Sequence, residues 1–212
     1  MVDNELEQRE LERATETVLA LGKVAMDFAG VERVPRYDPE TRESDVEHSF
    51  MLQLVAVELA ETHFPGLDSG LVAKFSGVHD LPEVISGDVA TFHVDKAMLA
   101  QKSKDEEAAI IQLEHILPPN TYSLLLRYEE QVEPEARFVR FVDKILPLIV
   151  DINGPGLQVM REDYAVETLA EYLVADAKQR ERCKELFTED HFEFLHKLRA
   201  MLSGTFASEF TV

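Results

Sequence analysis

Apolar residues recur with the spacing of an α-helix along almost the whole chain. Stretches with this spacing are separated by prolines and glycines, which end or interrupt helices. The pattern predicts helices at Leu6–Ala29, from Ser44 to Pro65, at Asp68–Asp80, Lys96–Leu117 and Thr121–Gln131, from Pro134 onward with a kink at Pro147, and at Tyr164–Phe187 and Glu189–Leu202. No strand of convincing length, repeat or low-complexity tract stands out. We therefore expect an all-α fold.

Two breaks in the pattern bear on how the chain is organised. The segment Arg33–Arg42 holds two prolines and is expected to be a loop. Asn153–Gly156 is the clearest break, and it leaves open whether a C-terminal helical pair stands apart from a core. Of the two arrangements we favour a single domain over residues 1–212, with the last eight residues loose.

Charge and composition narrow the classes of function. The chain has 212 residues, with 41 acidic against 21 basic side chains and a formal net charge of −20. Such a field repels phosphate backbones and anionic lipids, so neither a nucleic acid nor a membrane surface is expected as a partner. The single cysteine, Cys183, cannot form an internal disulfide, and the polar, acidic start of the chain is unlike a signal peptide. No window is apolar enough to span a membrane, and we expect a soluble, cytoplasmic protein.

Two histidines and two aspartates fall on the apolar faces of predicted helices. They are His48, His79, Asp80 and Asp143. A buried charge without a partner costs several kcal/mol, so such groups are paired or bind a metal. Taken singly, each residue fits a hydrogen-bonded group in the core. Taken together, on three helical faces, they favour a shared metal ion.

The side-chain types narrow the choice of metal. Two imidazoles and two carboxylates suit a divalent ion with an octahedral preference, such as Mn²⁺, Co²⁺, Fe²⁺, Ni²⁺ or Mg²⁺. Four protein ligands leave positions open for a water molecule and a substrate oxygen. No cysteine lies near these residues, so a structural zinc site is a poor fit. The sequence thus predicts one divalent ion with open coordination positions.

Three short motifs carry a resemblance to a known family. They are Asp45-Val46-Glu47-His48-Ser49, then Val78-His79-Asp80-Leu81-Pro82-Glu83 followed by Gly87-Asp88, and finally Val142-Asp143-Lys144. Their order resembles the H…HD…D signature of the HD-domain metal-dependent phosphohydrolases. With Arg33-Val34-Pro35 fifteen residues ahead of His48, the set is most similar to the bacterial 5′-deoxynucleotidases. The resemblance covers about residues 14–152, and the C-terminal helices, at about 160–203, carry none of it.

The resemblance implies an HD-domain helical bundle with additional C-terminal helices, and a role for each motif residue. One divalent metal would be held by His48, His79, Asp80 and Asp143. Glu83 would orient or deprotonate the attacking water, and Arg33 would bind the substrate phosphate. Asp88 would act as an acid or base, or hydrogen-bond the sugar hydroxyls. The implied protein is an enzyme that releases phosphate from nucleoside 5′-monophosphates, and its relatives suggest a homodimer.

One departure from the family pattern bears on the substrate. The deoxynucleotidases have a tryptophan between the arginine and the proline, where this chain has Val34, and the chain contains no tryptophan. In those proteins the tryptophan helps to exclude a ribose 2′-hydroxyl. We therefore expect a relaxed sugar specificity, with either deoxyribonucleotides or ribonucleotides accepted.

Three other functions fit the same motifs. A (deoxy)nucleoside triphosphate hydrolase of the superfamily would need more basic residues than lie near the motifs in the sequence. A di-iron oxygenase would need two more histidines between Asp80 and Asp143, for which His93 and His115 are available. A non-catalytic nucleotide sensor would need neither the full ligand set nor Glu83. We rank the nucleotidase first.

Overall fold

The computed structural model describes residues 2–90, 92 and 96–211. Its helices are α1 (Val2–Phe28), α2 (Asp45–His63), α3 (Ser69–Val78), α4 (Glu83–Ser86), α5 (Lys96–Leu113), α6 (Pro119–Glu130), α7 (Pro134–Asp143), α8 (Leu146–Asn153), α9 (Gly156–Glu162), α10 (Leu169–Leu186) and α11 (Glu193–Ala207). Two short strands, β1 (Glu32–Arg36) and β2 (Arg42–Ser44), and two 3₁₀ turns, η1 (Asp190–Phe192) and η2 (Ser208–Thr211), complete it. The all-α class is confirmed. No helix in these ranges is both long and apolar enough to cross a membrane.

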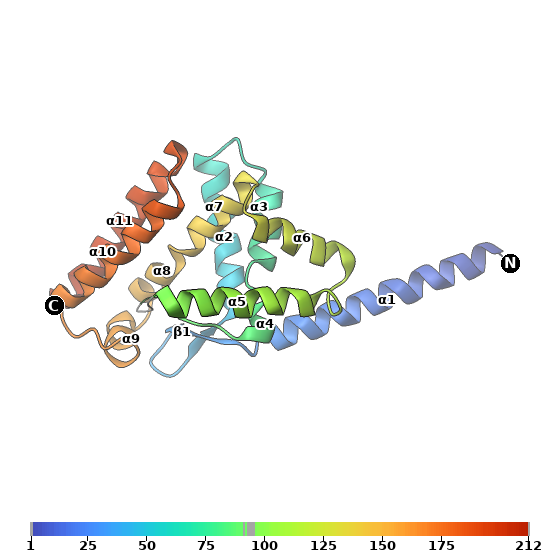
Figure 1. The fold of residues 1–212 in the computed structure, drawn as a ribbon, viewed down its shortest axis with the longest axis horizontal. Helices are drawn as coiled ribbons and strands as arrows, with labels where there is room; N and C mark the ends of the chain where they lie inside the picture. The colour runs from blue at the N-terminus through green and yellow to red at the C-terminus, as the bar shows by residue number, and fades with distance from the viewer. Residues whose placement is uncertain (1, 91, 93–95, 212) are drawn as a thin grey trace.

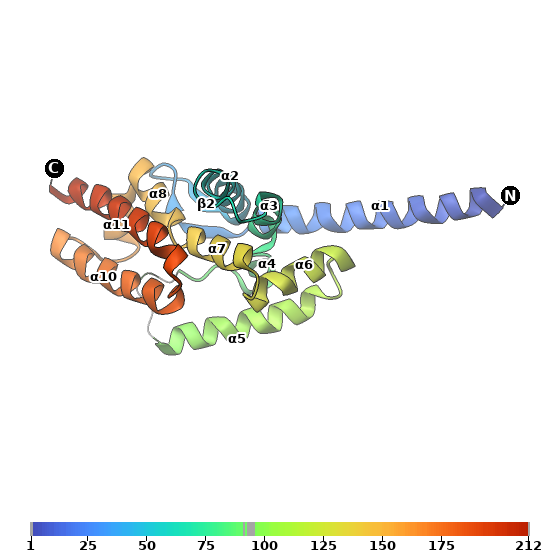
Figure 2. The same cartoon turned by 90° about the horizontal axis from the view of Figure 1, so that it is seen from above.

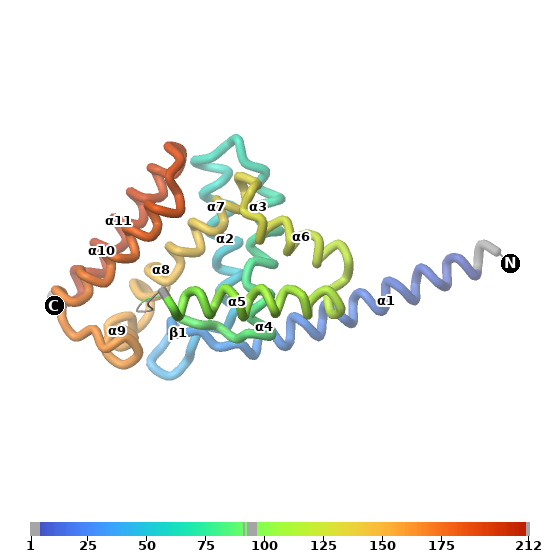
Figure 3. The backbone as a smooth tube through the Cα atoms, viewed as in Figure 1, coloured from blue at the N-terminus to red at the C-terminus, as the bar shows by residue number. Residues whose placement is uncertain are grey.

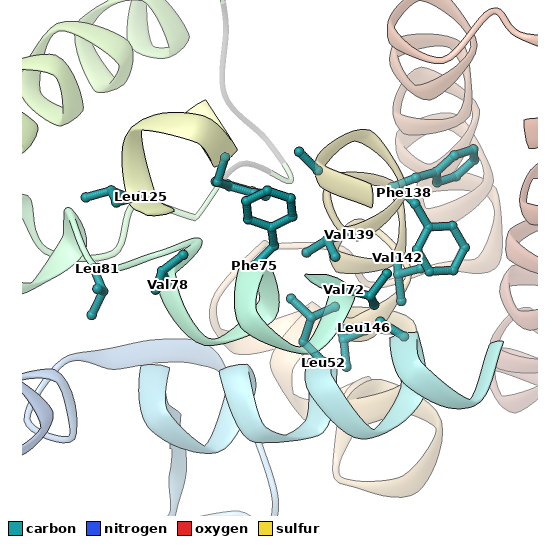
Figure 4. Packing of buried hydrophobic residues seen from close by; sticks show 14 of the residues in the cluster. Leu52, Val72, Phe75, Val78, Leu81, Leu125, Phe138, Val139, Val142 and Leu146 are labelled. Carbon is teal, nitrogen blue, oxygen red and sulfur yellow. The ribbon is translucent and has the colours of Figure 1, made fainter. Parts of the chain in front are cut away.

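The core lies where α2, α3, α7 and α8 meet. The first two pack along each other, and both contact α7. Figure 4 shows the apolar side chains of these helices gathered in one cluster, among them Leu52, Val72, Phe75, Val139 and Leu146. All five are fully buried, and burying a side chain of this size stabilises a fold by about 1.5–3 kcal/mol. The packing holds the ends of α2, α3 and α7 in place, and these ends carry the candidate residues.

The segment Arg33–Arg42, expected to be a loop, instead contributes to a β-hairpin. Strands β1 and β2 pair antiparallel, with Glu32 opposite Ser44. Asp38 closes the turn by accepting hydrogen bonds from two backbone N–H groups, each at 2.9 Å. Strands this short show too little alternation to be recognised, and prolines in the segment favour the prediction of a loop. The hairpin matters for the site because Arg33 lies on β1.

A proline begins a helix where the pattern predicted a kink. Helix α7 ends at Asp143, and α8 starts at Leu146 with Pro147 in its first turn, where a missing N–H costs nothing. Helix α8 ends at Asn153, where the pattern has its clearest break. A short helix that the pattern did not predict, α9, begins at Gly156. Helix α9 packs against α8 and β1. The chain is thereby brought back towards the hairpin.

Helix α10 begins later than its apolar pattern predicted. The expected start was Tyr164, but the helix starts at Leu169. The reason is a capping box in which Oγ1 of Thr168 accepts a hydrogen bond from the backbone N–H of Glu171, and the carboxylate of Glu171 accepts one from the backbone N–H of Thr168. The connection before it includes Ala165, which has a positive φ of 53°.

The C-terminal end is more ordered than expected. The expectation was that the last eight residues would be loose. Instead, helix α11 continues through Gly204 to Ala207, and η2 follows it to Thr211. Phe206 and Phe210 explain this, because their rings lie 5.2 Å and 5.3 Å from the ring of buried Tyr172. An aromatic cluster therefore anchors the end of the chain.

Helix α1 projects away from the other helices, as the ribbon in Figures 1 and 2 and the tube in Figure 3 show. Of its described side chains, only Val24 and Phe28 are buried, and both lie near its C-terminal end. Its earlier turns expose several apolar side chains, including Leu6, Leu11 and Val18. Most of this helix therefore makes no contact with the core.

We predict that Gly156→Ala destabilises the fold. A Cβ at this position would press against the backbone carbonyl of Asp151 and lie 2.6 Å from Cε2 of Phe206. Overpacking of this kind typically costs about 1–3 kcal/mol, so the midpoint of thermal or denaturant unfolding should fall. Gly22→Ala is the matched control, because nothing lies within 4 Å of a Cβ there. The packing argument is wrong if both variants unfold at the same point as the wild type.

Candidate metal centre and cavity

The structure brings the four histidine and aspartate side chains together. His48 comes from the first turn of α2, His79 and Asp80 follow the end of α3, and Asp143 ends α7. One ligand atom from each lies within 4.8 Å of the others. Nε2 of His48 is 3.0 Å from Oδ1 of Asp143, and Nε2 of His79 is 3.0 Å from Oδ2 of Asp80. We call these four residues the His/Asp cluster.

Local sequence explains why these helix ends meet. Ser44 caps α2, and its backbone and side chain exchange hydrogen bonds with Glu47 in a capping box. This fixes the first turn of α2, which carries His48. Pro82 lacks an N–H group and disfavours helical geometry in the residue before it, so α3 ends ahead of it. The two residues that follow α3 are thereby turned towards α2 and α7.

The hydrogen bonds of the two imidazoles leave Nε2 of each ring facing the carboxylates of the cluster. Nδ1 of His79 is 2.9 Å from the carbonyl oxygen of Ser76, which can only accept, so Nδ1 carries a proton. Nε2 of His79 is buried and lies 3.0 Å from Oδ2 of Asp80, and Nε2 of His48 lies 3.0 Å from Oδ1 of Asp143. These are the ring atoms that a metal ion among the four side chains would meet. Nδ1 of His48 faces Glu43 at 3.5 Å, an arrangement that orients a ligating histidine.

The surrounding charges favour a cation at the His/Asp cluster. Burial and Arg33 lower the pKa of His48, but the carboxylates of Asp143 and Glu43 outweigh them and raise it to about 9. Burial would raise the pKa of Asp143, but Lys144, 2.6 Å away, and His48 hold it well below its usual range. Ionised carboxylates thus stabilise a positive charge here, whether a proton or a metal ion. The donor set and its electrostatics fit a divalent ion.

Arg33 lies within an acidic surround next to the cluster. Its side chain is 11% exposed. Carboxylate oxygens of five residues lie within 4 Å of its guanidinium: Glu43, Asp45, Asp80, Glu83 and Asp88. Nη1 makes the closest contacts, at 3.0 Å to both Asp45 and Asp80. Nη2 makes no hydrogen bond within the described ranges, so its two N–H groups remain for a ligand.

Glu83 lies between Arg33 and a lysine that no motif marks. It begins α4 and is buried, with Oε2 3.5 Å from Nη1 of Arg33. Its Oε1 is 3.0 Å from Nζ of Lys102 on α5. Burial and the charge of Asp80 raise the pKa of Glu83 to about 10, although Lys102 and Arg33 oppose the shift. Glu83 thus lies within reach of both Arg33 and the cavity, where a carboxyl can exchange a proton with a bound water.

A cavity opens beside the cluster. It contains about 990 Å³ of space, part of which is open to solvent. One part of its wall is formed by Arg33, Asp80, Glu83, Asp88 and Asp143. The other part comes from α8 to α11 and the residues between them, with Leu148, Asp151, Val159, Met160, Tyr164 and Tyr172. Its wall combines several charged side chains with apolar and aromatic ones, as the walls of small-molecule sites do.

Asp151 is a carboxyl in this wall that no sequence motif marks. It lies on α8, and 5% of the residue is exposed. Burial raises its pKa to about 8, and the carboxylates of Glu209 and Glu43 add to the shift. Its carboxyl group makes no hydrogen bond or ion pair in the part of the chain that the structure describes. In the sequence, the one feature that could have pointed to Asp151 is its charge between Val150 and Ile152, within a predominantly apolar helix.

Of the two histidines available for a second metal, the one that the structure describes does not join the cluster. His115 is exposed in the turn after α5, and His93 lies outside the described residues. The other group of potential ligands found among the described side chains contains carboxylates alone, from Asp45, Asp80 and Glu83. Arg33 contacts all three, so positive charge is already supplied there. The di-iron alternative therefore gains no support.

The comparison with protein families agrees with this geometry. Residues 31–181 match the model of the HD domain family. The chain belongs to the HD domain family, and the resemblance drawn from its motifs is confirmed.

Individual relatives are consistent with this membership. The 5′-deoxynucleotidase HDDC2 of Bos taurus is 30% identical over 123 residues, covering 54% of this chain and 58% of that protein. The protein of the same name from Homo sapiens is 28% identical, with the same coverage. The match thus spans less than two thirds of these relatives. A crystal structure of a "predicted metal-dependent phosphohydrolase" from Magnetospirillum magnetotacticum MS-1 shares the fold, with a TM-score of 0.67. The two chains are 24% identical, and the match covers 92% of this chain and 95% of that one.

We predict that Asp151 makes the fold less stable as the pH rises. An unfolded aspartate loses its proton near pH 4, whereas the folded protein retains the proton of Asp151 to about pH 8. Between these values the folded state binds more protons than the unfolded state, so its stability falls with rising pH. Asp151→Asn removes this dependence and should gain stability over the wild type progressively from about pH 4 to about pH 8.

Unfolding midpoints in acidic and mildly alkaline buffer measure the effect. Asp105→Asn, at an exposed position on α5, is the control and should show the same small difference from the wild type in both buffers. A gain for Asp151→Asn that is equal in the two buffers would show that Asp151 is ionised in the folded protein.

Proposed function

We propose that this protein is a metal-dependent phosphomonoesterase that releases phosphate from nucleoside 5′-monophosphates. The observation that carries the proposal is the convergence of the His/Asp cluster beside a cavity lined by both charged and apolar side chains. Membership of the HD domain family and the likeness to proteins named 5′-deoxynucleotidase support it. The net charge of −20 remains unfavourable for a nucleic acid as substrate and suits a small nucleotide that meets positive charge only at the site.

One divalent metal ion would be held by His48, His79, Asp80 and Asp143. When bound, such an ion lowers the pKa of a coordinated water and neutralises charge on phosphate oxygens. Mn²⁺, Co²⁺, Fe²⁺, Ni²⁺ and Mg²⁺ all accept nitrogen and oxygen ligands in this mixture. Glu43 and the carbonyl of Ser76 orient the two imidazoles so that each presents Nε2 to the ion.

Arg33 and Glu83 would bind the phosphate and move a proton. Carboxylates hold Nη1 and Nε of Arg33, which leaves Nη2 to donate hydrogen bonds to a phosphate oxygen. Glu83 lies beside Arg33 and faces the same cavity, so its carboxyl can exchange a proton with the attacking water or the leaving oxygen. Lys102 holds Glu83 in this position through its 3.0 Å contact.

Asp88 and Val34 would face the sugar. Both line the cavity, and Oδ1 of Asp88 is 3.8 Å from Nη1 of Arg33. A carboxylate at that point can accept hydrogen bonds from sugar hydroxyls. Valine fills much less space than tryptophan, so a ribose 2′-hydroxyl finds room. We therefore propose that both deoxyribonucleotides and ribonucleotides are accepted.

Two lysines favour a second candidate, a nucleoside triphosphate hydrolase. Lys102 and Lys144 both line the cavity, and they add the positive charge that a longer polyphosphate needs. Lys102 is far from the motifs in the sequence but close to them in the fold, so the cavity has more basic residues than the motif segments alone suggest. The products distinguish the two reactions, because triphosphate or pyrophosphate release indicates the second and orthophosphate release from monophosphates the first.

We also propose that the chain forms a homodimer through α1. The exposed leucines and valines of this helix support the proposal, because such side chains gain stability when another surface covers them. A groove lined by Leu21, Phe28, Phe50 and Val78 lies at the base of the helix, between α1, α2 and α3. A second copy of α1 is the occupant that suits it. We further propose that residues 1–212 act as a single domain.

The proposed activity predicts metal-dependent phosphate release. Purified protein with added Mn²⁺ or Co²⁺ should release orthophosphate from nucleoside 5′-monophosphates, and a chelator should abolish this. Asp80→Ala removes one ligand and should lower both the bound metal and the rate by at least about 100-fold. Asp105→Ala, on the exposed face of α5, is the matched control and should retain both. No phosphate release with any of the five metals on any nucleotide would disprove the proposal.

A second prediction separates proton transfer from metal binding. Glu83→Gln keeps the size of the side chain but removes its titratable proton, so kcat should fall by about 10²- to 10⁴-fold. The metal content should remain near that of the wild type, because Glu83 is outside the His/Asp cluster. Glu130→Gln, at an exposed position on α6, serves as the control. Unchanged kcat for Glu83→Gln would remove Glu83 from the mechanism.

A further inference from the structure

The wall of the cavity contains a buried carboxyl with which no described residue pairs. Asp151 faces the cavity that also reaches Asp80 and Asp143, and its residue is 5% exposed. Buried polar groups are almost always hydrogen-bonded, because leaving one unpaired costs free energy. The carboxyl of Asp151 has no hydrogen bond or ion pair within the described ranges. Such a group in the wall of a cavity is placed to bind something that enters it.

The position of Asp151 suits the far end of a nucleotide. Asp143 ends α7 and Asp151 lies on α8, so the two carboxyls come from different helices that line one cavity. Asp151 belongs neither to the His/Asp cluster nor to the carboxylates around Arg33. With the phosphate at the cluster and the sugar beside Asp88, the base is the part of the nucleotide that is left to reach this wall. Val159, Met160 and Tyr164 line the same part of the wall and offer apolar surface to a flat ring.

We infer that Asp151 binds the edge of the nucleobase through its carboxyl group. This inference rests on the proposed function. Burial, Glu209 and Glu43 all favour the neutral form of this carboxyl, and no cation among the described residues ion-pairs with it. A neutral carboxyl has one O–H donor next to one carbonyl acceptor. Its complement is an N–H group adjacent to a ring nitrogen or a carbonyl oxygen.

All common nucleobases present such an edge. Adenine and cytosine offer an amino group beside a ring nitrogen, whereas guanine and thymine or uracil offer a ring N–H beside a carbonyl. Asp151 therefore selects for the presence of a base and not for its identity. Nucleoside monophosphates should bind more tightly than a sugar phosphate that lacks the base, and the different bases should bind about equally.

Two substitutions distinguish this role from a structural one. Asp151→Asn keeps a donor next to an acceptor, whereas Asp151→Leu removes both and keeps a side chain that branches at the same atom but is larger. We expect Asp151→Asn to retain the preference for nucleotides over 2-deoxyribose 5-phosphate within about 3-fold, and Asp151→Leu to lower it by about 10- to 100-fold, as the loss of two hydrogen bonds implies. Asp151→Asn should not unfold earlier than the wild type, because no described residue pairs with the carboxyl, and the unfolding midpoint of Asp151→Leu shows whether the larger side chain is accommodated.

The experiment measures binding as well as turnover. Calorimetry in the Glu83→Gln background with Mn²⁺ gives the Kd of each nucleoside monophosphate and of 2-deoxyribose 5-phosphate, and phosphate release is measured with Glu83 intact. Asn153→Leu, exposed at the end of the same helix, is the control and should keep the preference.

The outcomes separate the inference from the proposed function. Tighter binding of nucleotides that Asp151→Leu abolishes supports the inference, even if no phosphate is released and the proposed function fails. A preference that Asp151→Leu leaves intact overturns the inference while phosphate release upholds the function. Equal binding of nucleotides and sugar phosphate by the protein with Asp151 intact also overturns the inference.

Discussion

The site depends on the pairing of many buried carboxylates with very few positive charges. Arg33 alone is within 4 Å of carboxylates from five residues, and they come from β2, the start of α2, the end of α3 and the region of α4. Buried carboxylates without counter-charge are costly, so one guanidinium constrains the relative positions of all these segments. The His/Asp cluster lies at the edge of this network, where the remaining negative charge favours a divalent cation.

The apolar core explains why this network forms at helix ends. Helices α2, α3 and α7 bury their middle turns against one another, and polar groups are excluded there. His48 and Asp143 lie in terminal turns, and Asp80 lies just beyond one, where the packed stripes give way to a cavity. The free energy of the core can then offset the cost of bringing like charges together. A functional site that is destabilising by itself is a common arrangement in enzymes.

The sequence predicted the cluster better than it predicted its surroundings. His48 and Asp143 lie on apolar stripes of long helices, and helical periodicity with motif order was enough to bring them together in the prediction. The hairpin around Arg33 was missed because its strands are too short for alternation to be detected. Lys102 approaches Glu83 only through tertiary packing of α5, and no local pattern contains that information. Contacts between separate helices and strands depend on the whole fold. Helix caps and the apolar faces of helices depend on residues that are close together in the sequence.

Under the proposed function, the cavity would divide chemistry from substrate recognition between two parts of the chain. The motifs supply the cluster, Arg33 and Glu83, whereas helices α8 to α11, which carry almost none of the signature, supply much of the remaining wall. Groups near the metal must meet a strict geometry, because the phosphate is the same in every substrate of this class. Residues such as Asp151 meet no such constraint and can change without disturbing the ligands. Substrate range should therefore follow the C-terminal helices, and a family signature read from the motifs identifies the reaction more firmly than the molecule on which it acts.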